Sequence, residues 1–303
     1  MNRMISAIAA LGLATVMMST ACSSGDPMSA DGVSRSPEGT VIVGSADFPE
    51  SQLLATIFAQ ALEKAGLHTE SKLNIGSREV YVPALKDGSI DLIPEYTGAT
   101  LSYLDPKSEV HTTNEVNAAL SQQLPKELKM LTPSPAQNTD ILAVTQDTAT
   151  KYSLKTISDL VPVAGQLVLG GPPEWKTRKE GVAGLRDVYG LNFKDFKSLD
   201  VAGPITLSAL VNGQVQVADL TSTDPAVREE KLVALDDDKQ LFPAQNIVPI
   251  IAAAKDNDKI DRALNAVTAA LTTADLNAMN QRIANKESMD TIASDWLAQH
   301  HLA

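Results

Sequence analysis

Residues 84–104 constrain the fold of this chain more than any other segment. They read Ala-Leu-Lys-Asp-Gly-Ser-Ile-Asp-Leu-Ile-Pro-Glu-Tyr-Thr-Gly-Ala-Thr-Leu-Ser-Tyr-Leu. This order predicts a helix that ends at Gly88 and a short apolar strand over 90–93. Pro94 predicts a break into a polar turn that opens another helix. Small molecules bind beyond the carboxyl ends of the strands in an open α/β sheet, and Tyr96 is expected at such a place.

A related pattern recurs at residues 209–217. Both copies follow Ala-Leu-x-x-Gly-x-(Ile/Val)-x-(Leu/Val), and a polar turn follows each one, at 95–97 and at 221–224. Two interpretations stay open: a chance recurrence of a common helix–glycine–strand pattern, or two related lobes that face one cleft.

Strands and helices alternate along the chain, which favours an α/β fold with a parallel sheet covered by helices. The first such unit is predicted from strands at 41–44, 73–75 and 90–93 and from helices at 53–65 and 80–87.

The chain is expected to cross twice between two lobes. The Pro-rich residues 132–135 precede a strand at 141–144, and strands at 167–169 and 215–220 continue the second lobe. Residues 242–246 precede an apolar strand at 247–253, which is the predicted return, and helices follow from about 258. The predicted first lobe therefore comprises residues 40–137 with 246–303, and the second comprises 138–245.

The amino terminus predicts export. Arg3 is followed by a charge-free stretch over 5–18, which is too short to span a bilayer and suits the apolar region of a signal peptide. Residues 19–22, Ser-Thr-Ala-Cys, resemble a bacterial lipoprotein processing site, although Ser19 replaces the usual Leu. A signal peptide at 1–21 and lipidation of Cys22 are predicted; an ordinary signal peptide with an incidental cysteine is the alternative.

Residues 22–39 are rich in Ser, Gly, Pro and Asp, so they predict a flexible tether between the lipid and the folded part. The chain has one cysteine and therefore no internal disulfide. Of the 25 basic residues only Arg3 lies within 1–21, so the processed chain carries 24 basic and 37 acidic residues and a formal charge of −13. Such an acidic chain excludes nucleic acid as an expected partner.

Five motifs in order resemble the osmoprotectant-binding proteins of ABC importers, the glycine betaine, choline and carnitine group. The resemblance implies a two-lobed periplasmic-binding-protein fold of type II with a ligand cleft between the lobes. It also implies hinge closure on one small solute, which the protein delivers to ABC permease and ATPase subunits. We expect a monomer, and the amino-terminal pattern predicts that it is lipid-anchored to the outer face of the cell membrane. The motifs lie at 44–50, 88–104, 173–185, 222–224 and 237–243.

The family holds a quaternary ammonium group in a cage of tyrosines. Here Tyr96 matches one cage position, but three further positions where tyrosine is usual carry Asp140, Thr221 and Gln245. If each lost ring contributed roughly 1 to 2 kcal/mol, betaine would bind more weakly here than in cage-bearing relatives.

A polar ligand site is therefore predicted, and a polar hydroxyl-rich or aromatic non-quaternary ligand is the alternative to an osmoprotectant. Tyr96 as a packing residue and Arg178 as a solvated charge are the alternatives to ligand contact. The residues predicted to line the site are Asp47, Tyr96, Asp140, Arg178, Thr221 and Gln245.

Catalysis has no support in the sequence. The chain lacks Gly-x-Ser-x-Gly, a Walker phosphate loop and Gly-x-Gly-x-x-Gly, and its four histidines lack metal-ligand spacing. We expect no enzyme activity, no catalytic residue, no metal and no cofactor. A ligand-sensing lipoprotein remains the alternative to a transport component.

We predict that Cys22→Ala moves the protein from the membrane fraction to the soluble fraction, because a terminus with two or more acyl chains anchors firmly whereas a bare acidic domain does not. Fractionation of cells, with intact-mass measurement of the mature protein, tests this expectation. A soluble wild type with no mass added at Cys22 would contradict it.

Overall fold

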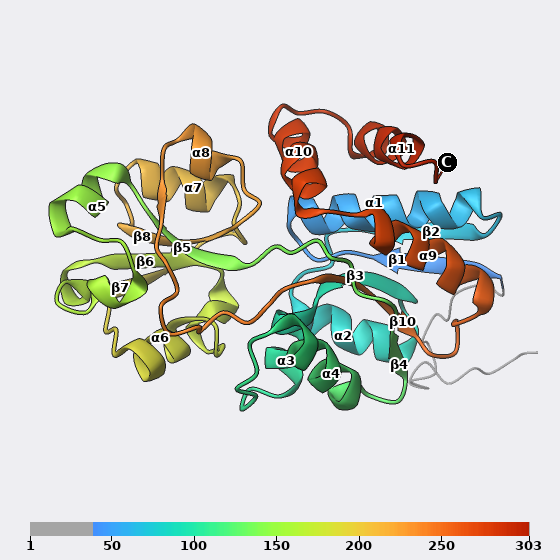
Figure 1. The fold of residues 1–303 in the computed structure, drawn as a ribbon, viewed down its shortest axis with the longest axis horizontal. Helices are drawn as coiled ribbons and strands as arrows, with labels where there is room; N and C mark the ends of the chain where they lie inside the picture. Colours follow the sequence, from blue (N-terminus) through green and yellow to red (C-terminus); the bar gives the residue numbers. More distant parts are fainter. Residues whose placement is uncertain (1–38, 303) are drawn as a thin grey trace, which may run out of the picture. The chain divides into compact units, whose positions relative to one another are not determined.

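Two five-stranded sheets with covering helices make up residues 39–302, the part of the chain that this computed structural model describes (Figure 1). The predicted signal peptide, Cys22 and the tether up to residue 38 lie outside the described residues. The two sheets confirm the predicted two-lobed α/β fold.

The first sheet has the strand order β2-β1-β3-β10-β4. Strand β1 is parallel to β2 and β3, whereas β10 is antiparallel to β3 and β4. We call this sheet with its helices the first lobe. Its strands are β1 (Thr40–Gly44), β2 (His68–Lys72), β3 (Leu92–Tyr96), β4 (Leu128–Met130) and β10 (Ile247–Ala252), and its helices are α1 (Pro49–Lys64), α2 (Arg78–Asp87), α3 (Thr97–Leu104), α4 (Thr113–Gln123), α9 (Asp258–Ala270), α10 (Thr273–Ala284) and α11 (Met289–Gln299).

The second sheet has the order β7-β6-β8-β5-β9 and repeats this arrangement. Strand β6 is parallel to β7 and β8, and β5 is antiparallel to β8 and β9. We call this sheet with its helices the second lobe. Its strands are β5 (Asp140–Val144), β6 (Val168–Gly171), β7 (Asp195–Ser198), β8 (Val217–Thr221) and β9 (Val233–Ala234), and its helices are α5 (Gln146–Tyr152), η1 (Ile157–Leu160), η2 (Ala164–Gln166), η3 (Pro173–Lys176), α6 (Val182–Tyr189), α7 (Pro204–Val211) and α8 (Ala226–Glu229).

Two connecting segments, residues 131–139 and 235–246, join the sheets (Figure 1). They pair with each other: Gln137 forms an antiparallel bridge with Asn246, and the Asn138 N–H donates to the Gln245 carbonyl at 3.1 Å. The two connections therefore run side by side as a short two-stranded link.

Each lobe has its own apolar core. In the first lobe, Leu53, Ile57 and Phe58 on one face of α1 are fully buried, as the sequence pattern predicted. Each such side chain stabilises the fold by about 1.5 to 3 kcal/mol. Every helix in residues 39–302 falls short of the length or the apolar character that crossing a bilayer requires.

The predicted strand at 73–75 is wrong, because the strand lies five residues earlier, at β2. Strand β2 is the edge of its sheet and bonds only to β1, and none of its five residues is buried. A solvated edge strand needs no apolar side chains, so it carries no hydrophobic signal.

The predicted turn at Pro94 is also wrong. Strand β3 continues through Pro94 to Tyr96, and α3 begins at Thr97. Pro94 lies opposite Pro249 of β10, while the pairing of β3 with β1 reaches only Leu92. Proline has no N–H to donate, and at this register no partner strand needs one.

We predict that Gly98→Ala lowers the free energy of unfolding by about 1 to 3 kcal/mol, because extra atoms overpack a filled site. An added Cβ would lie 2.6 Å from the Ala244 carbonyl oxygen and 2.8 Å from Pro243. Urea unfolding measures the change. Gly165→Ala is the control, since its Cβ would meet nothing nearer than 3.9 Å; equal losses in both variants would contradict this account.

Candidate functional site

A cavity of about 70 Å³ lies between the two lobes and is lined by residues of both. The first lobe contributes two aromatic rings, the second lobe contributes a third, and the connecting segments close one side. Its lining residues are Phe48, Arg78, Tyr96, Ala99, Asn138, Asp140, Pro172, Glu174, Trp175, Arg178, Glu180, Val201, Asp219, Thr221 and Gln245.

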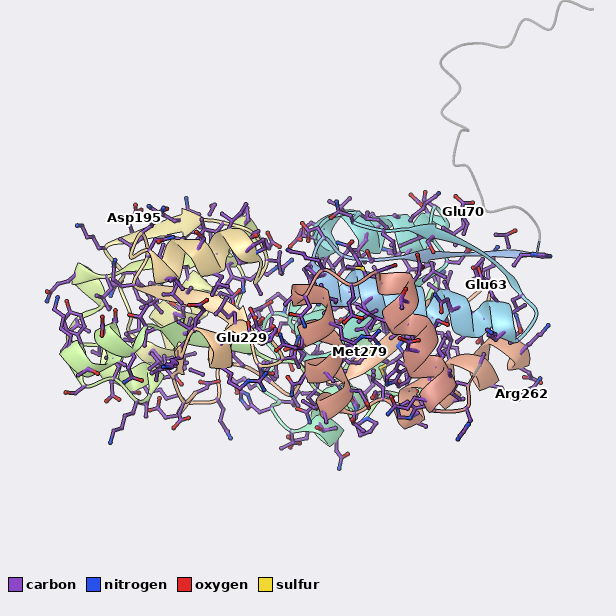
Figure 2. All side chains as sticks on the ribbon, turned by 90° about the horizontal axis from the view of Figure 1, so that it is seen from above. Glu63, Glu70, Asp195, Glu229, Arg262 and Met279 are labelled. Carbon is purple, nitrogen blue, oxygen red and sulfur yellow. The ribbon has the colours of Figure 1, made fainter. Side chains whose placement is uncertain are left out.

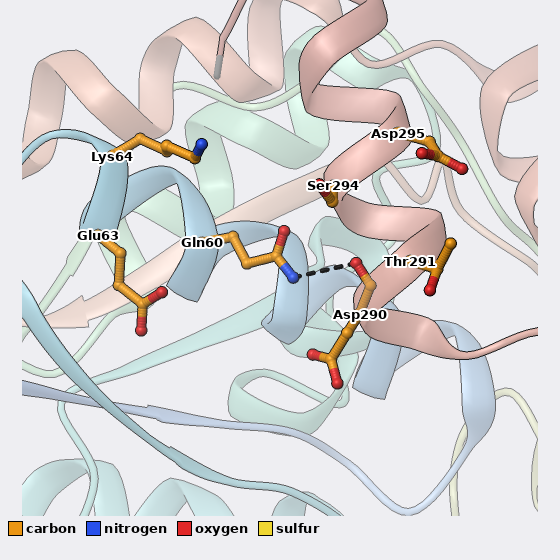
Figure 3. A pocket seen from close by; sticks show the side chains of 7 residues that line it. All are labelled: Gln60, Glu63, Lys64, Asp290, Thr291, Ser294 and Asp295. Atoms are coloured by element: carbon orange, nitrogen blue, oxygen red, sulfur yellow. Dashed lines mark hydrogen bonds between the residues drawn. The ribbon is translucent and has the colours of Figure 1, made fainter.

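A wider depression of about 450 Å³ lies on the first lobe between α1 and α11 (Figure 3). Gln60 bridges the two helices by donating to the backbone carbonyl of Asp290 at 3.1 Å. This depression is open, has no aromatic ring and belongs to one lobe. Movement of the lobes would not enclose a solute there. A further cavity of about 370 Å³ between the lobes has one aromatic ring, that of Phe48. We therefore regard the cavity that three aromatic rings line as the candidate site.

Strand ends build the cavity. Tyr96 ends β3, Thr221 ends β8, and Pro172 follows the end of β6. Asp140 begins the antiparallel strand β5 and lies directly opposite Thr221. Loops and side chains beyond the carboxyl ends of parallel strands are the usual position of a ligand in such sheets.

Five of the six side chains predicted for the site line this cavity: Tyr96, Asp140, Arg178, Thr221 and Gln245. The structure does not bring Asp47 to it. Asp47 is exposed, and the next residue, Phe48, lines the cavity instead as the residue that precedes α1.

Sequence reasoning missed several lining residues, although three of them, Asp219, Trp175 and Glu180, had a signal. Asp219 is a charged residue within the apolar strand β8, which is unusual unless the side chain serves a site. Trp175 and Glu180 lie inside the motif at 173–185 that resembles the importer family. Arg78, at the start of α2, carried no signal in the pattern of its neighbours.

The hydroxyl and the ring of Tyr96 both contact neighbouring side chains. Its hydroxyl donates to Glu50 Oε1 at 2.7 Å, and its ring packs at 5.8 Å, centre to centre, against the ring of Phe48. Burial, and then the neighbouring Glu50, raises the pKa of Tyr96 well above its ordinary value. The hydroxyl therefore stays protonated and is engaged within the protein, and the ring remains as the surface toward the cavity.

Glu50 is a buried carboxylate that gathers donors from both lobes and from a connecting segment. Its Oε1 also accepts from Asn138 Nδ2 at 2.8 Å, and its Oε2 accepts from Thr223 Oγ1 and Asn280 Nδ2, each at 2.6 Å. Only 5% of Glu50 is exposed, so the four hydrogen bonds replace water for the charge. We call Glu50 with these four donors the Glu50 network.

Both arginines in the cavity already have acidic partners. Arg78 forms two hydrogen bonds with the buried Glu95, at 3.1 and 2.7 Å. Arg178 reaches from the second lobe to Glu79 on α2, at 2.9 Å, and lies 3.8 Å from Glu174. Arg178 thus joins the two lobes across the edge of the cavity.

Gln245 connects a helix end to an acid. Its Oε1 accepts from the backbone N–H of Ala99 at 2.8 Å, and its Nε2 lies 3.5 Å from Asp140 Oδ2. The amide of Gln245 therefore links α3 of the first lobe to β5 of the second lobe. Among residues 39–302, no cluster of three or more His, Cys, Asp or Glu side chains is arranged to hold a metal ion.

Comparison of the chain with known proteins identifies its family. The family described as the substrate-binding domain of ABC-type glycine betaine transport systems matches residues 39–299. A glycine-betaine-binding protein of Pseudomonas aeruginosa is 27% identical over 283 residues, which cover 87% of this chain and 88% of that protein. The glycine betaine-binding protein YehZ of Escherichia coli K12 is 29% identical over 276 residues, with 86% and 90% covered.

A solved structure supports the fold. The crystal structure of a glycine betaine/carnitine/choline ABC transporter protein superposes with a TM-score of 0.67 at 24% identity, covering 86% of this chain and 99% of that one. At this identity the likeness establishes the shared two-lobed fold.

We predict that Glu50→Gln lowers the free energy of unfolding by at least about 1 to 3 kcal/mol, because an amide that presents N–H groups leaves some of the four donors unpaired. Urea unfolding with an unchanged m-value provides the measurement. Glu70→Gln, at an exposed position of β2 (Figure 2), is the matched control. Equal midpoints for the two variants would show that the Glu50 network contributes little.

Proposed function

Because the chain belongs to the family of substrate-binding domains of ABC-type glycine betaine transport systems, we propose that the cavity between its lobes is the solute site. The protein captures one small solute there and delivers it to a membrane permease that works with an ATPase subunit. The observation that carries this proposal is the cavity itself, since strand ends of both lobes, three aromatic rings and several charged groups converge on it.

The proposed solute contacts are Tyr96, Asp140, Arg178, Thr221 and Gln245, together with Phe48 and Trp175. Asp47 is left out because its exposed side chain lies outside the cavity. The names of the bacterial relatives support an osmoprotectant-class solute. The acidic and amide groups of the lining equally support a more polar solute, whose donors and acceptors they would pair.

We propose that the lobes close by bending at two short segments, residues 137–141 and 243–248. The lobes would then be residues 40–137 with 246–303 and residues 138–245. The bridge between Gln137 and Asn246 supports this placement, because paired segments bend together. The ion pair of Arg178 with Glu79 spans the lobes and would form or break during that motion.

We also propose that the protein is exported and that a lipid is attached to Cys22. The sequence pattern around Cys22 supports an anchor on the outer face of the membrane, with residues 22–39 as the tether and the protein acting as a monomer. Cys22 lies outside the described residues, and the fractionation experiment given above tests it directly.

The proposal predicts that a solute from a panel of quaternary amines, amino acids, polyols and aromatic glycosides raises the melting temperature by mass action. The same solute should reduce the radius of gyration measured by solution scattering, because the lobes close on it. Thr221→Leu narrows the cavity and should weaken binding by about tenfold or more, equivalent to about 1.4 kcal/mol.

Thr132→Leu is the control, since Thr132 is an exposed residue of the connecting segment 131–139 that lies outside the cavity. A panel in which no solute changes either the melting temperature or the scattering curve would refute the proposed site. Equal binding by Thr221→Leu and the wild type would place the solute elsewhere.

A further inference from the structure

Three carboxylates form an acidic cluster on the second-lobe side of the cavity: Asp140, Glu180 and Asp219. Asp140 begins β5 and Asp219 lies on the adjacent strand β8, opposite Leu142. Glu180 comes from the loop before α6 and is 5% exposed, and Asp219 is 3% exposed. We call these three residues the acidic cluster.

Both nearby arginines are paired with acids outside the acidic cluster and form no salt bridge with it. The guanidinium of Arg78 is bound to Glu95, and that of Arg178 is bound to Glu79 and lies close to Glu174. No salt bridge within residues 39–302 includes a member of the acidic cluster. The lining has four acidic side chains, those of Asp140, Glu174, Glu180 and Asp219, and two basic ones, those of Arg78 and Arg178.

The acidic cluster also lacks hydrogen-bond donors. Asp219 Oδ1 is buried and has no hydrogen-bond partner among the described residues. Asp140 has only the amide of Gln245, at 3.5 Å, which is a long contact. A buried acceptor without a donor costs about 1 to 3 kcal/mol, so a solute that brings donors recovers that free energy on binding.

We propose that this site, taken as the solute site of the proposed function, selects a solute that presents N–H or O–H donors to the acidic cluster and discriminates against a fully methylated ammonium group. A quaternary ammonium ion carries the same charge as a protonated amine, so both are attracted to carboxylates. Only the protonated amine, or a hydroxyl, can pair the oxygen of Asp219.

The rings of Phe48 and Tyr96 from the first lobe and of Trp175 from the second lobe also line the cavity. They contact the carbon skeleton of the solute, while the donors face the acidic cluster. The cavity thus offers aromatic rings and acceptor oxygens to one solute within a small space.

The pH dependence of the affinity distinguishes a charged solute from a neutral one, because carboxylates of the acidic cluster bind protons. Burial, and then the nearby Glu180, raises the pKa of Asp140 to about 7, although Arg78 and Arg178 oppose this shift. Burial, and then Asp140, raises the pKa of Asp219 well above its ordinary value. A cation favours the ionised carboxylates, so its affinity rises as the pH increases through about 7 and falls below it.

Isothermal titration with two matched pairs tests the proposal. Ethanolamine and choline share a skeleton and a charge but differ by N–H groups against methyl groups, and catechol and its dimethyl ether differ in the same way at hydroxyls. We expect the donor member of at least one pair to bind about tenfold tighter or better than its methylated partner. If that member is ethanolamine, its affinity should increase between about one pH unit below and one above neutrality, whereas catechol should show no such increase.

Asp219→Asn, which keeps the shape of the side chain, should reduce the preference for the donor member; Asp140→Asn is the second variant. Asp195→Asn, an exposed position on β7 of the same lobe (Figure 2), is the control and should leave the preference unchanged. Melting temperatures of all three variants establish that they are folded.

Equal or tighter binding of choline and of the dimethyl ether would overturn this inference and leave the proposed function standing. So would a solute that binds in the cavity with the same affinity in Asp219→Asn and Asp140→Asn as in the wild type. Failure of every solute, including the broad panel above, would overturn both the inference and the proposed site.

Discussion

The buried carboxylate of Glu50 is the interaction on which the arrangement of the site depends. It lies near the start of α1 and accepts hydrogen bonds from Tyr96 and Asn280 of the first lobe, Asn138 of a connecting segment and Thr223 of the second lobe. A buried charge is tolerated only when it is fully paired. The same pairing orients the ring of Tyr96 and links the two lobes in the described state, so the ring and the position of the lobes depend on one network.

Each sheet contains one antiparallel strand, and the chain enters that strand directly after a connecting segment. Strand β5 enters the second sheet directly after one connecting segment, and β10 returns to the first sheet directly after the other. Both crossings thus lie next to the strand ends that line the cavity. The ion pair of Arg178 with Glu79 also joins the lobes, as does Gln281 of α10, whose amide donates to Glu229 on α8 at 2.7 Å.

Local patterns predicted what depends on local chemistry. The apolar face of α1 was legible because buried faces repeat at the period of their element, and β10 was legible as a continuous apolar run. The edge strand β2 was not, because a solvated strand has no such repeat. Pro94 was misjudged since its tolerance depends on how far the neighbouring strand β1 extends, which no local pattern records.

The sequence by itself determined the α/β class, the export pattern, the importer-like motifs and five residues of the cavity wall. Only the tertiary structure decided that Phe48 rather than Asp47 faces the cavity, that Arg78 and Arg178 are already paired, and that Asp219 is left without a donor. The physical reason is that a motif identifies which residue types are present along the chain. Whether a charge is free or neutralised depends on partners that are distant in sequence, and folding alone brings those partners within hydrogen-bond distance.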